Sequence, residues 1–181
     1  MSQERDFAKT ELKNFIVDIP NYPEPGVIFR DITPILNNSS AFKMVVDQLA
    51  AYAIAQQAKV IIAPEARGFL FVPAVSYVTN LRFVPVRKPG KLPRQVISAK
   101  YSYEYATNQL EMHVEDLKPH DRVLIVDDVL ATGGTAQAIC ELVKKQQATI
   151  VGLAFVVDLT YLNGKKDLTA YPIKTLIEYS A

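Results

Sequence analysis

Two hydrophobic rhythms alternate along this 181-residue chain and predict alternating strands and helices. Short unbroken apolar runs that are rich in β-branched residues are typical of strands buried on both faces of a parallel sheet. Such runs occupy residues 60–63, 83–86, 123–126 and 150–157, and residues 173–179 add a strand by alternation. This order favours the α/β fold class, with a mainly parallel central sheet flanked by helices.

Helical spacing of apolar residues lies between these runs. Residues 41–57 follow a mainly three- and four-residue rhythm after Asn and Ser residues suited to capping. Residues 135–145 are an amphipathic helix candidate, and another helix ends near Asn80 after a turn at Gly68. Pro73 suits the first turn of that helix, because its missing N–H has no helical partner there.

Two segments break the alternation. A first helix over residues 6–16 is expected to give way to an ordered loop, because Pro20, Pro23 and Pro25 prevent a regular helix. Residues 87–114 are polar, tyrosine-rich and too long for an ordinary connection. They predict a functional excursion such as a two-stranded flap. No repeat or break in composition separates a second domain, so a single domain over residues 1–181 is expected.

The amino-acid composition limits the kinds of binding site that the chain can contain. A net charge of +1 gives no global reason to expect a nucleic-acid surface, so any anion site must be local. Cys140 cannot form an internal disulfide, and with His113 and His120 it is a poor supply for a zinc site. The charged N-terminus lacks the apolar core of a signal peptide, and no apolar run approaches a membrane span. We expect a soluble protein in a reducing, cytoplasmic setting.

The segment VLIVDDVLATGGT at residues 123–135 carries the strongest chemical signal. Asp127 and Asp128 are expected at the carboxyl end of a strand, where ligands bind in parallel sheets. Successive N–H groups and hydroxyls can hold a phosphate at the start of the next helix, in a loop made of Ala131, Thr132, Gly133, Gly134 and Thr135. Carboxylates beside such a cradle suit a ribose cis-diol and a Mg²⁺ that bridges substrate phosphates. The segment therefore predicts a phosphorylated sugar as ligand.

Other interpretations of the segment fit less well. It lacks the Gly-Lys-Ser/Thr ending of a triphosphatase loop and the three-glycine spacing of a dinucleotide site. An Asp-rich turn with a glycine-rich helix entry can serve only to change the direction of the chain. The ordered succession of strand, acidic pair and two-glycine loop favours the functional interpretation.

The same segment closely resembles the 5-phosphoribosyl 1-pyrophosphate (PRPP) motif of the type I phosphoribosyltransferase family, in particular its adenine-using members. The resemblance extends in the family's order over residues 22–36, 64–71, 84–93, 101–106 and 156–164. It implies transfer of the phosphoribosyl group from PRPP to adenine, with AMP and pyrophosphate as products, in purine salvage. It also implies Mg²⁺, a homodimer, a small N-terminal hood that binds the base within about residues 1–36, and a long flexible flap at about 88–114.

The resemblance also implies roles for single residues. Glu104 in the flap is the candidate catalytic acid, which shares a proton with the purine, and Asp127 and Asp128 bind the ribose and, through water, the metal. The residues expected to contact pyrophosphate are Arg67, Arg87, Lys88 and Lys91. The residues expected to bind adenine are Ile28, Phe29, Arg30 and Leu159.

Departures and rivals limit this transfer. Ala66 stands where many relatives have serine, and Val72 where glycine is expected, but neither change removes a proposed chemical group. A close rival is a phosphoribosyltransferase for another base, because the PRPP site does not specify the acceptor. A rival of another class is a PRPP-sensing regulator without catalysis. The near-neutral charge and the lack of a recognisable DNA-binding extension argue against that regulator.

Overall fold

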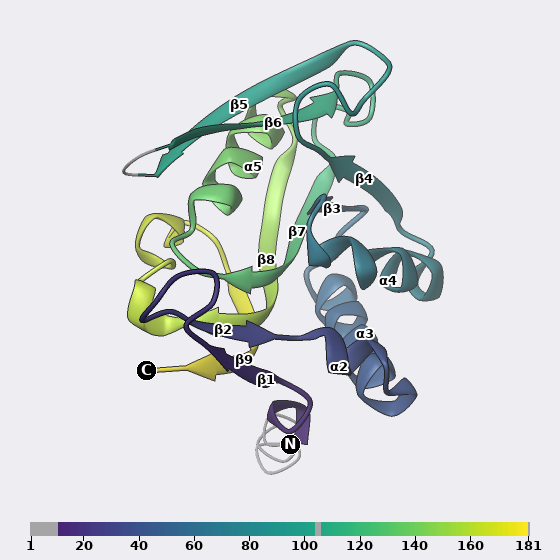
Figure 1. The fold of residues 1–181 in the computed structure, drawn as a ribbon. Coiled ribbons are helices and arrows are strands. Elements are labelled where there is room, and N and C mark those ends of the chain that lie inside the picture. Colours follow the sequence, from purple (N-terminus) through teal and green to yellow (C-terminus); the bar gives the residue numbers. More distant parts are fainter. Residues whose placement is uncertain (1–10, 104–105, 181) are drawn as a thin grey trace.

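The computed structural model describes residues 11–103 and 106–180 and is built around one sheet of five parallel strands (Figure 1). The strand order is β4-β3-β7-β8-β9, and every neighbouring pair runs parallel. The bounds are β3 (Val60–Pro64), β4 (Arg82–Val86), β7 (Arg122–Leu130), β8 (Thr149–Leu159) and β9 (Ile173–Tyr179). The prediction of a mainly parallel central sheet is confirmed.

Helices cover both faces of this sheet. The longest, α3 (Ser39–Ala55), packs with α4 (Val72–Thr79) on one face, and α5 (Gly134–Lys145) packs on the other. Successive strand residues therefore enter two different hydrophobic cores: Ile61 joins the α3 and α4 side, whereas Ile62 joins the α5 side. Burial on both faces explains why the strands are continuously apolar rather than alternating.

The predicted helices are present, with small shifts at their ends. Helix α3 begins two residues before the predicted start, because Asn38 caps it by accepting a hydrogen bond from the Ala41 N–H at 2.9 Å. Pro73 lies in the first turn of α4, and Asn80 ends that helix in the left-handed conformation. Residues 6–10 of the expected first helix lie outside the described residues, and residues 11–13 are helical. A short α2 (Thr33–Leu36) was not predicted.

The proline-containing N-terminal segment is a hairpin rather than only a loop. Its strands β1 (Val17–Pro20) and β2 (Ile28–Asp31) pair antiparallel and lie beside the end of β9 (Figure 1). The guanidinium of Arg30 sits 4.1 Å from the ring centroid of Tyr179, at the end of β9. This contact fixes the hairpin against the sheet.

The long excursion is a two-stranded ribbon of β5 (Val96–Tyr103) and β6 (Ala106–His113), which crosses α5 in Figure 1. Ala99, Leu110 and Met112 bury their side chains in the α5 core, and Lys145 of α5 donates a hydrogen bond to the Ser98 carbonyl. Among the described residues, no helix is long and apolar enough to cross a membrane.

Strand β7 corrects one expectation about the acidic pair. Asp127 and Asp128 lie inside this strand and not at its end, because β7 continues to Leu130. The neighbouring β3 ends at Pro64, after pairing with β7 as far as Ile125. The pair is therefore bordered on that side by a gap in the sheet, where a short 3-10 helix η1 (Arg67–Leu70) follows β3.

Candidate functional site

The acidic pair is buried, and η1 packs against it where β3 has ended. Asp127 is 8% exposed and Asp128 is 4% exposed. Burial, together with the adjacent charge of Asp128, raises the pKa of Asp127 well above its usual value. Asp128 is instead balanced by Arg67, whose Nε lies 2.9 Å from its Oδ2. Two neighbouring carboxylates thus have different environments.

The turn at Gly68 fits tightly against this pair. A Cβ atom at Gly68 would lie 2.9 Å from Oδ1 and 3.1 Å from Cα of Asp127. Only glycine lets η1 approach so closely without moving the strand. The predicted glycine turn therefore serves to place Arg67 over the acidic pair.

The predicted phosphate loop follows β7 directly and leads into α5. Gly133 adopts the left-handed conformation with φ of 87°, whereas Gly134 is already the first residue of the helix. Only the first glycine is thus required by a turn. A small hollow of about 40 Å³ lies between the loop and Asp127 and is lined by Thr132, Gly133 and Thr135 among others. The free N–H groups of the α5 N-terminus favour an anion here.

A larger cavity of about 440 Å³ opens on the other side of Arg67. Its size suits a small organic ligand. The guanidinium of Arg67 lies 4.7 Å from the ring centroid of Phe29, so this residue contacts both the acidic pair and the cavity wall. The cavity is lined by Gly26, Val27, Ile28, Phe29, Arg30, Arg67, Val129, Leu159, Tyr161 and Leu162.

All four residues predicted to bind the base line this cavity. Ile28, Phe29 and Arg30 come from β2, and Leu159 ends β8 on a different part of the chain. The buried side chain of Arg30 is engaged by Asp18 and by the ring of Tyr179. Its backbone, rather than its charge, is the part suited to reading a planar ligand.

The predicted cationic set is divided in the structure. Arg67 lies in the site, whereas Arg87 donates hydrogen bonds to both carboxylate oxygens of Glu65, at 2.9 and 2.6 Å. These hydrogen bonds lower the pKa of Glu65. Lys88 and Lys91 follow Arg87 as exposed residues after β4, and Arg87 also donates to the Lys91 carbonyl at 2.9 Å. Both arginines follow adjacent strand ends, because Pro64 pairs with Val86.

One predicted residue of the site lies outside the described residues, and several residues of the site were not predicted from the sequence. Glu104, the expected catalytic acid, lies outside the described residues. Val129, Tyr161 and Leu162 line the cavity but were not predicted, because an apolar residue near a strand end gives no local signal of a ligand. Glu65 was not predicted either, because its partner Arg87 lies 22 residues away in the sequence.

The donors for a metal are two carboxylates. Within residues 11–103 and 106–180, no group of three or more His, Cys, Asp or Glu side chains could hold a metal ion. Asp127 and Asp128 nevertheless fit a Mg²⁺ held mainly by substrate oxygens, because Mg²⁺ is commonly bound through one or two carboxylates and substrate phosphates. A cation would also offset the burial that disfavours the charged form of Asp127.

Known proteins similar to this chain share both its sequence and its fold. A family model described as "Phosphoribosyl transferase domain" matches residues 34–179. An adenine phosphoribosyltransferase of Mycoplasma capricolum is 53% identical over 168 residues, covering 93% of this chain and 99% of the relative.

Solved structures give the same result. The crystal structure of adenine phosphoribosyltransferase from Thermoanaerobacter pseudethanolicus has a TM-score of 0.90 and 43% identity, covering 94% of this chain and 99% of that one. The enzyme from Saccharomyces cerevisiae, solved with adenine and an imino-altritol bisphosphate, has a TM-score of 0.89 and 35% identity, covering 94% and 99%.

Proposed function

The chain belongs to the phosphoribosyltransferase family, and on this premise we propose that it transfers the 5-phosphoribosyl group of PRPP to adenine. The products are AMP and pyrophosphate, and the reaction is a step of purine salvage. The relatives of about half identity over nearly the full length are named for this activity. The rival acceptors hypoxanthine, guanine, xanthine and orotate are disfavoured by the same relatives.

The observation that carries this proposal is the position of Arg67 between two unlike compartments. On one side lie the acidic pair and the phosphate loop, and on the other lies an apolar cavity lined by Phe29 and Leu159. A planar base in the cavity and a ribose phosphate over Asp127 and Asp128 would meet at Arg67. Holding both reactants in one geometry is a large source of rate acceleration.

In the proposed reaction the bond between ribose C1 and the pyrophosphate oxygen breaks, and a bond from adenine N9 to C1 forms. The pyrophosphate leaves with the electron pair of the broken bond, and the N9 proton of adenine passes to solvent water. Asp127 and Asp128 orient the ribose by accepting hydrogen bonds from its hydroxyls, and the 131–135 loop anchors the 5-phosphate. Arg67 offers N–H donors to the departing pyrophosphate.

The remaining roles rest on resemblance and chemistry. Arg87, Lys88 and Lys91 would add positive charge near the leaving group, once Arg87 exchanges Glu65 for a phosphate. Glu104 would share a proton with the purine. Mg²⁺, when bound, neutralises the pyrophosphate charge as it leaves. We also propose that the chain is a single catalytic domain that forms a homodimer in the cytoplasm. Within this domain, the β1–β2 hairpin would act as a hood and the β5–β6 ribbon as a closing flap.

The proposal is tested by incubating the chain with PRPP and Mg²⁺ against adenine, hypoxanthine, guanine, xanthine and orotate. We expect AMP and pyrophosphate to form in equal amounts with adenine, and little product with the other bases. Omission of Mg²⁺ should abolish turnover. If another base reacts while adenine does not, the acceptor is wrong. If PRPP binds but no base reacts, the chain is a sensor rather than an enzyme.

A further inference from the structure

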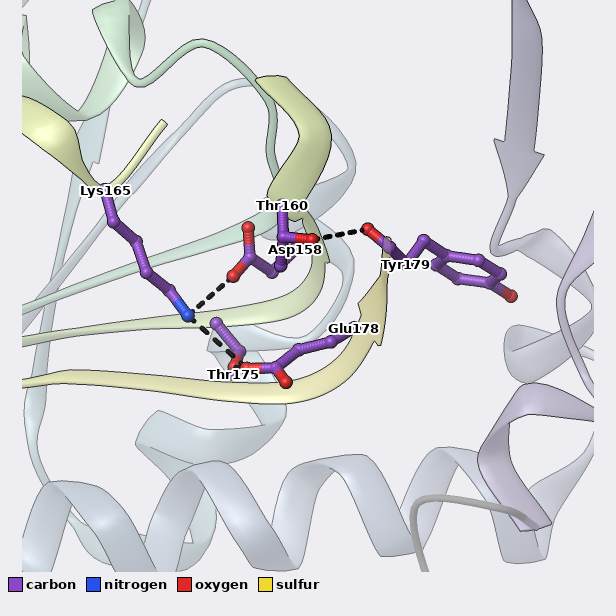
Figure 2. Close-up of polar contacts among 6 residues, drawn as sticks. All are labelled: Asp158, Thr160, Lys165, Thr175, Glu178 and Tyr179. Carbon is purple, nitrogen blue, oxygen red and sulfur yellow. Dashed lines mark hydrogen bonds and ion pairs between the residues drawn. The ribbon is translucent and has the colours of Figure 1, made fainter. Parts of the chain in front are cut away.

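An ion pair with a buried carboxylate lies just outside the proposed site, at the carboxyl end of β8. The carboxylate of Asp158 is only 1% exposed, and its Oδ2 lies 2.6 Å from Nζ of Lys165. Figure 2 shows Lys165 reaching from the segment after β8 toward Asp158 and Glu178, whose Oε1 lies 3.4 Å from the same Nζ. Thr175 donates a hydrogen bond to that Oε1 at 2.8 Å. This cluster contacts neither compartment of the site directly.

The chain between the two charged residues makes the connection to the site. Asp158 and Lys165 flank residues 159–164, which contain the 3-10 helix η2 (Thr160–Leu162). Leu159, immediately after Asp158, lines the base cavity together with Tyr161 and Leu162. The ion pair thus closes the base of a short loop that forms one wall of this cavity.

The other end of the same loop supports the phosphate loop. Gly164, immediately before Lys165, packs so closely that a Cβ atom would lie 2.2 Å from the Ala131 carbonyl oxygen. In the opposite direction, a Cβ at Gly133 would lie 2.4 Å from the Gly164 carbonyl oxygen. Two backbones in such contact cannot move independently. A shift of residue 165 would therefore be felt at the phosphate loop.

The buried position of the Asp158 carboxylate beside Lys165 needs a physical explanation. Burying a carboxylate is costly, and an ion pair inside a protein often stabilises it no more than apolar residues of similar volume. Oδ1 of Asp158 has no hydrogen-bond partner among the residues that the structure describes. The contact with Lys165 therefore compensates for burying the Asp158 carboxylate. Burial disfavours the charged form of Lys165, but its contacts with Asp158 and Glu178 outweigh that effect and raise its pKa. These contacts therefore hold the Lys165 ammonium in one direction, toward the ends of β8 and β9.

We infer that Lys165 is a positioning residue, which ties the 159–164 loop to Asp158 so that the base wall and the phosphate loop keep one fixed separation. The inference rests on the proposed function, because that separation is the distance between the base and the 5-phosphate of one nucleotide. Thr160 supports the same loop by donating a hydrogen bond to the Tyr179 carbonyl at 3.0 Å (Figure 2). A purely structural ion pair would affect folding alone.

The test compares Lys165→Met with three further variants. Lys165→Met leaves Asp158 buried without its partner, which strongly destabilises a protein, so the main variant is the charge-free pair Asp158→Asn with Lys165→Met. Lys165→Arg keeps the ion pair and should rescue. Lys166→Met removes the same charge from the exposed neighbouring residue and serves as the matched control. Folding is checked by thermal unfolding, and measurements are made well below each midpoint.

We expect the double variant to bind AMP about tenfold more weakly and to raise the KM for adenine and for PRPP together, because small misplacements at such sites cost rate and affinity steeply. Lys165→Arg should recover most of the affinity, and Lys166→Met should match the wild type. A folded double variant with unchanged AMP affinity, or with only one KM raised, overturns the inference. A wild-type protein that binds no AMP counts against the proposed function instead.

Discussion

At the scale of single residues, the acidic pair combines a structural cost with a proposed use. Asp127 is almost entirely enclosed, and its carboxylate adjoins that of Asp128. An ionised carboxylate in this position destabilises the folded state unless a cation or a ribose hydroxyl compensates for it. A bound substrate or cation would therefore stabilise the ionised form of Asp127.

The raised pKa of Asp127 gives a prediction with a definite sign. Below its usual value of 3.8 the carboxyl is neutral in both the folded and unfolded states, and no penalty exists. As pH rises through the higher folded-state pKa, ionisation is disfavoured only in the folded protein, so stability is lost. Asp127→Asn removes this loss and should raise the Tm at pH 7–8 by a few degrees, since about 1 kcal/mol shifts Tm by about 2–4 °C at this chain length.

Thermal unfolding between pH 4.5 and 8 measures this effect, and the advantage of the variant should shrink toward the acidic end. Asp47→Asn, at an exposed position of α3, changes the same net charge and should show no such pH dependence beyond the loss of its contact with Lys43. Turnover by Asp127→Asn should fall, because one ribose contact is weakened. A Tm below that of the wild type at pH 7–8 would contradict the burial argument.

Residues of the site differ in how well the sequence predicts them. Asp127, Asp128 and Gly133 occur in one short segment, where strand, charge and glycine follow each other and carry a local chemical signal. Lys165 gives no such signal, because its role arises from contacts with Asp158 and Glu178 that only the folded sheet creates. Exposed lysines are so common that composition alone argues for a solvated surface.

At the scale of elements, periodicity located the sheet strands and main helices but not every boundary. The β1–β2 hairpin was expected only as a loop, because prolines weaken the strand pattern even though Pro20 is tolerated at the edge of a two-stranded pair. Strand β7 runs through its acidic pair to Leu130, because pairing with β8 continues on one side after β3 has ended on the other. Tertiary pairing thus overrides the local polarity that suggested a strand end.

Helix α3 offers a prediction that separates stability from activity. Its cap, Asn38, accepts a hydrogen bond from the Ala41 N–H, whereas the preceding Asn37 contributes its own backbone N–H to the end of α2. Asn38→Ala should cost about 1 kcal/mol, because an orphan donor of the first turn loses its partner. The Tm should then fall by about 2–4 °C.

The KM values for both substrates should stay unchanged in Asn38→Ala, because α3 contributes no residue to either compartment of the site. Asn37→Ala, which keeps the backbone hydrogen bond, is the matched control and should unfold close to the wild type. An increased KM in Asn38→Ala would mean that α3 influences the site through the sheet.

At the scale of the whole molecule, the proposed nucleotide site joins elements from distant parts of the chain. The base cavity combines the β1–β2 hairpin with the end of β8, and the phosphate hollow combines β7 with α5. The two hydrophobic cores lie on opposite faces of the sheet. A nucleotide that fills both compartments would connect elements packed into both cores.

AMP should accordingly stabilise the entire fold. A ligand at a hundred times its Kd stabilises the folded state by about 2.7 kcal/mol, which corresponds to a rise in Tm of about 5–10 °C for a chain of this length. Adenosine has the same base and ribose but no phosphate, so at the same concentration it should raise the Tm far less. The difference between the rises in Tm caused by AMP and by adenosine measures how much the phosphate loop contributes to binding.

Gly133→Ala should remove most of that difference, because its φ of 87° disfavours a side chain and the new Cβ would meet the Gly164 carbonyl. The stabilisation by AMP should then approach that by adenosine. The adenosine effect should itself decrease somewhat, because Gly164 belongs to the 159–164 loop that forms one wall of the base cavity. Differential scanning calorimetry of both proteins with both ligands measures this. Equal stabilisation of the wild type by AMP and adenosine would show that the 131–135 loop does not bind phosphate, because that loop then contributes nothing to affinity.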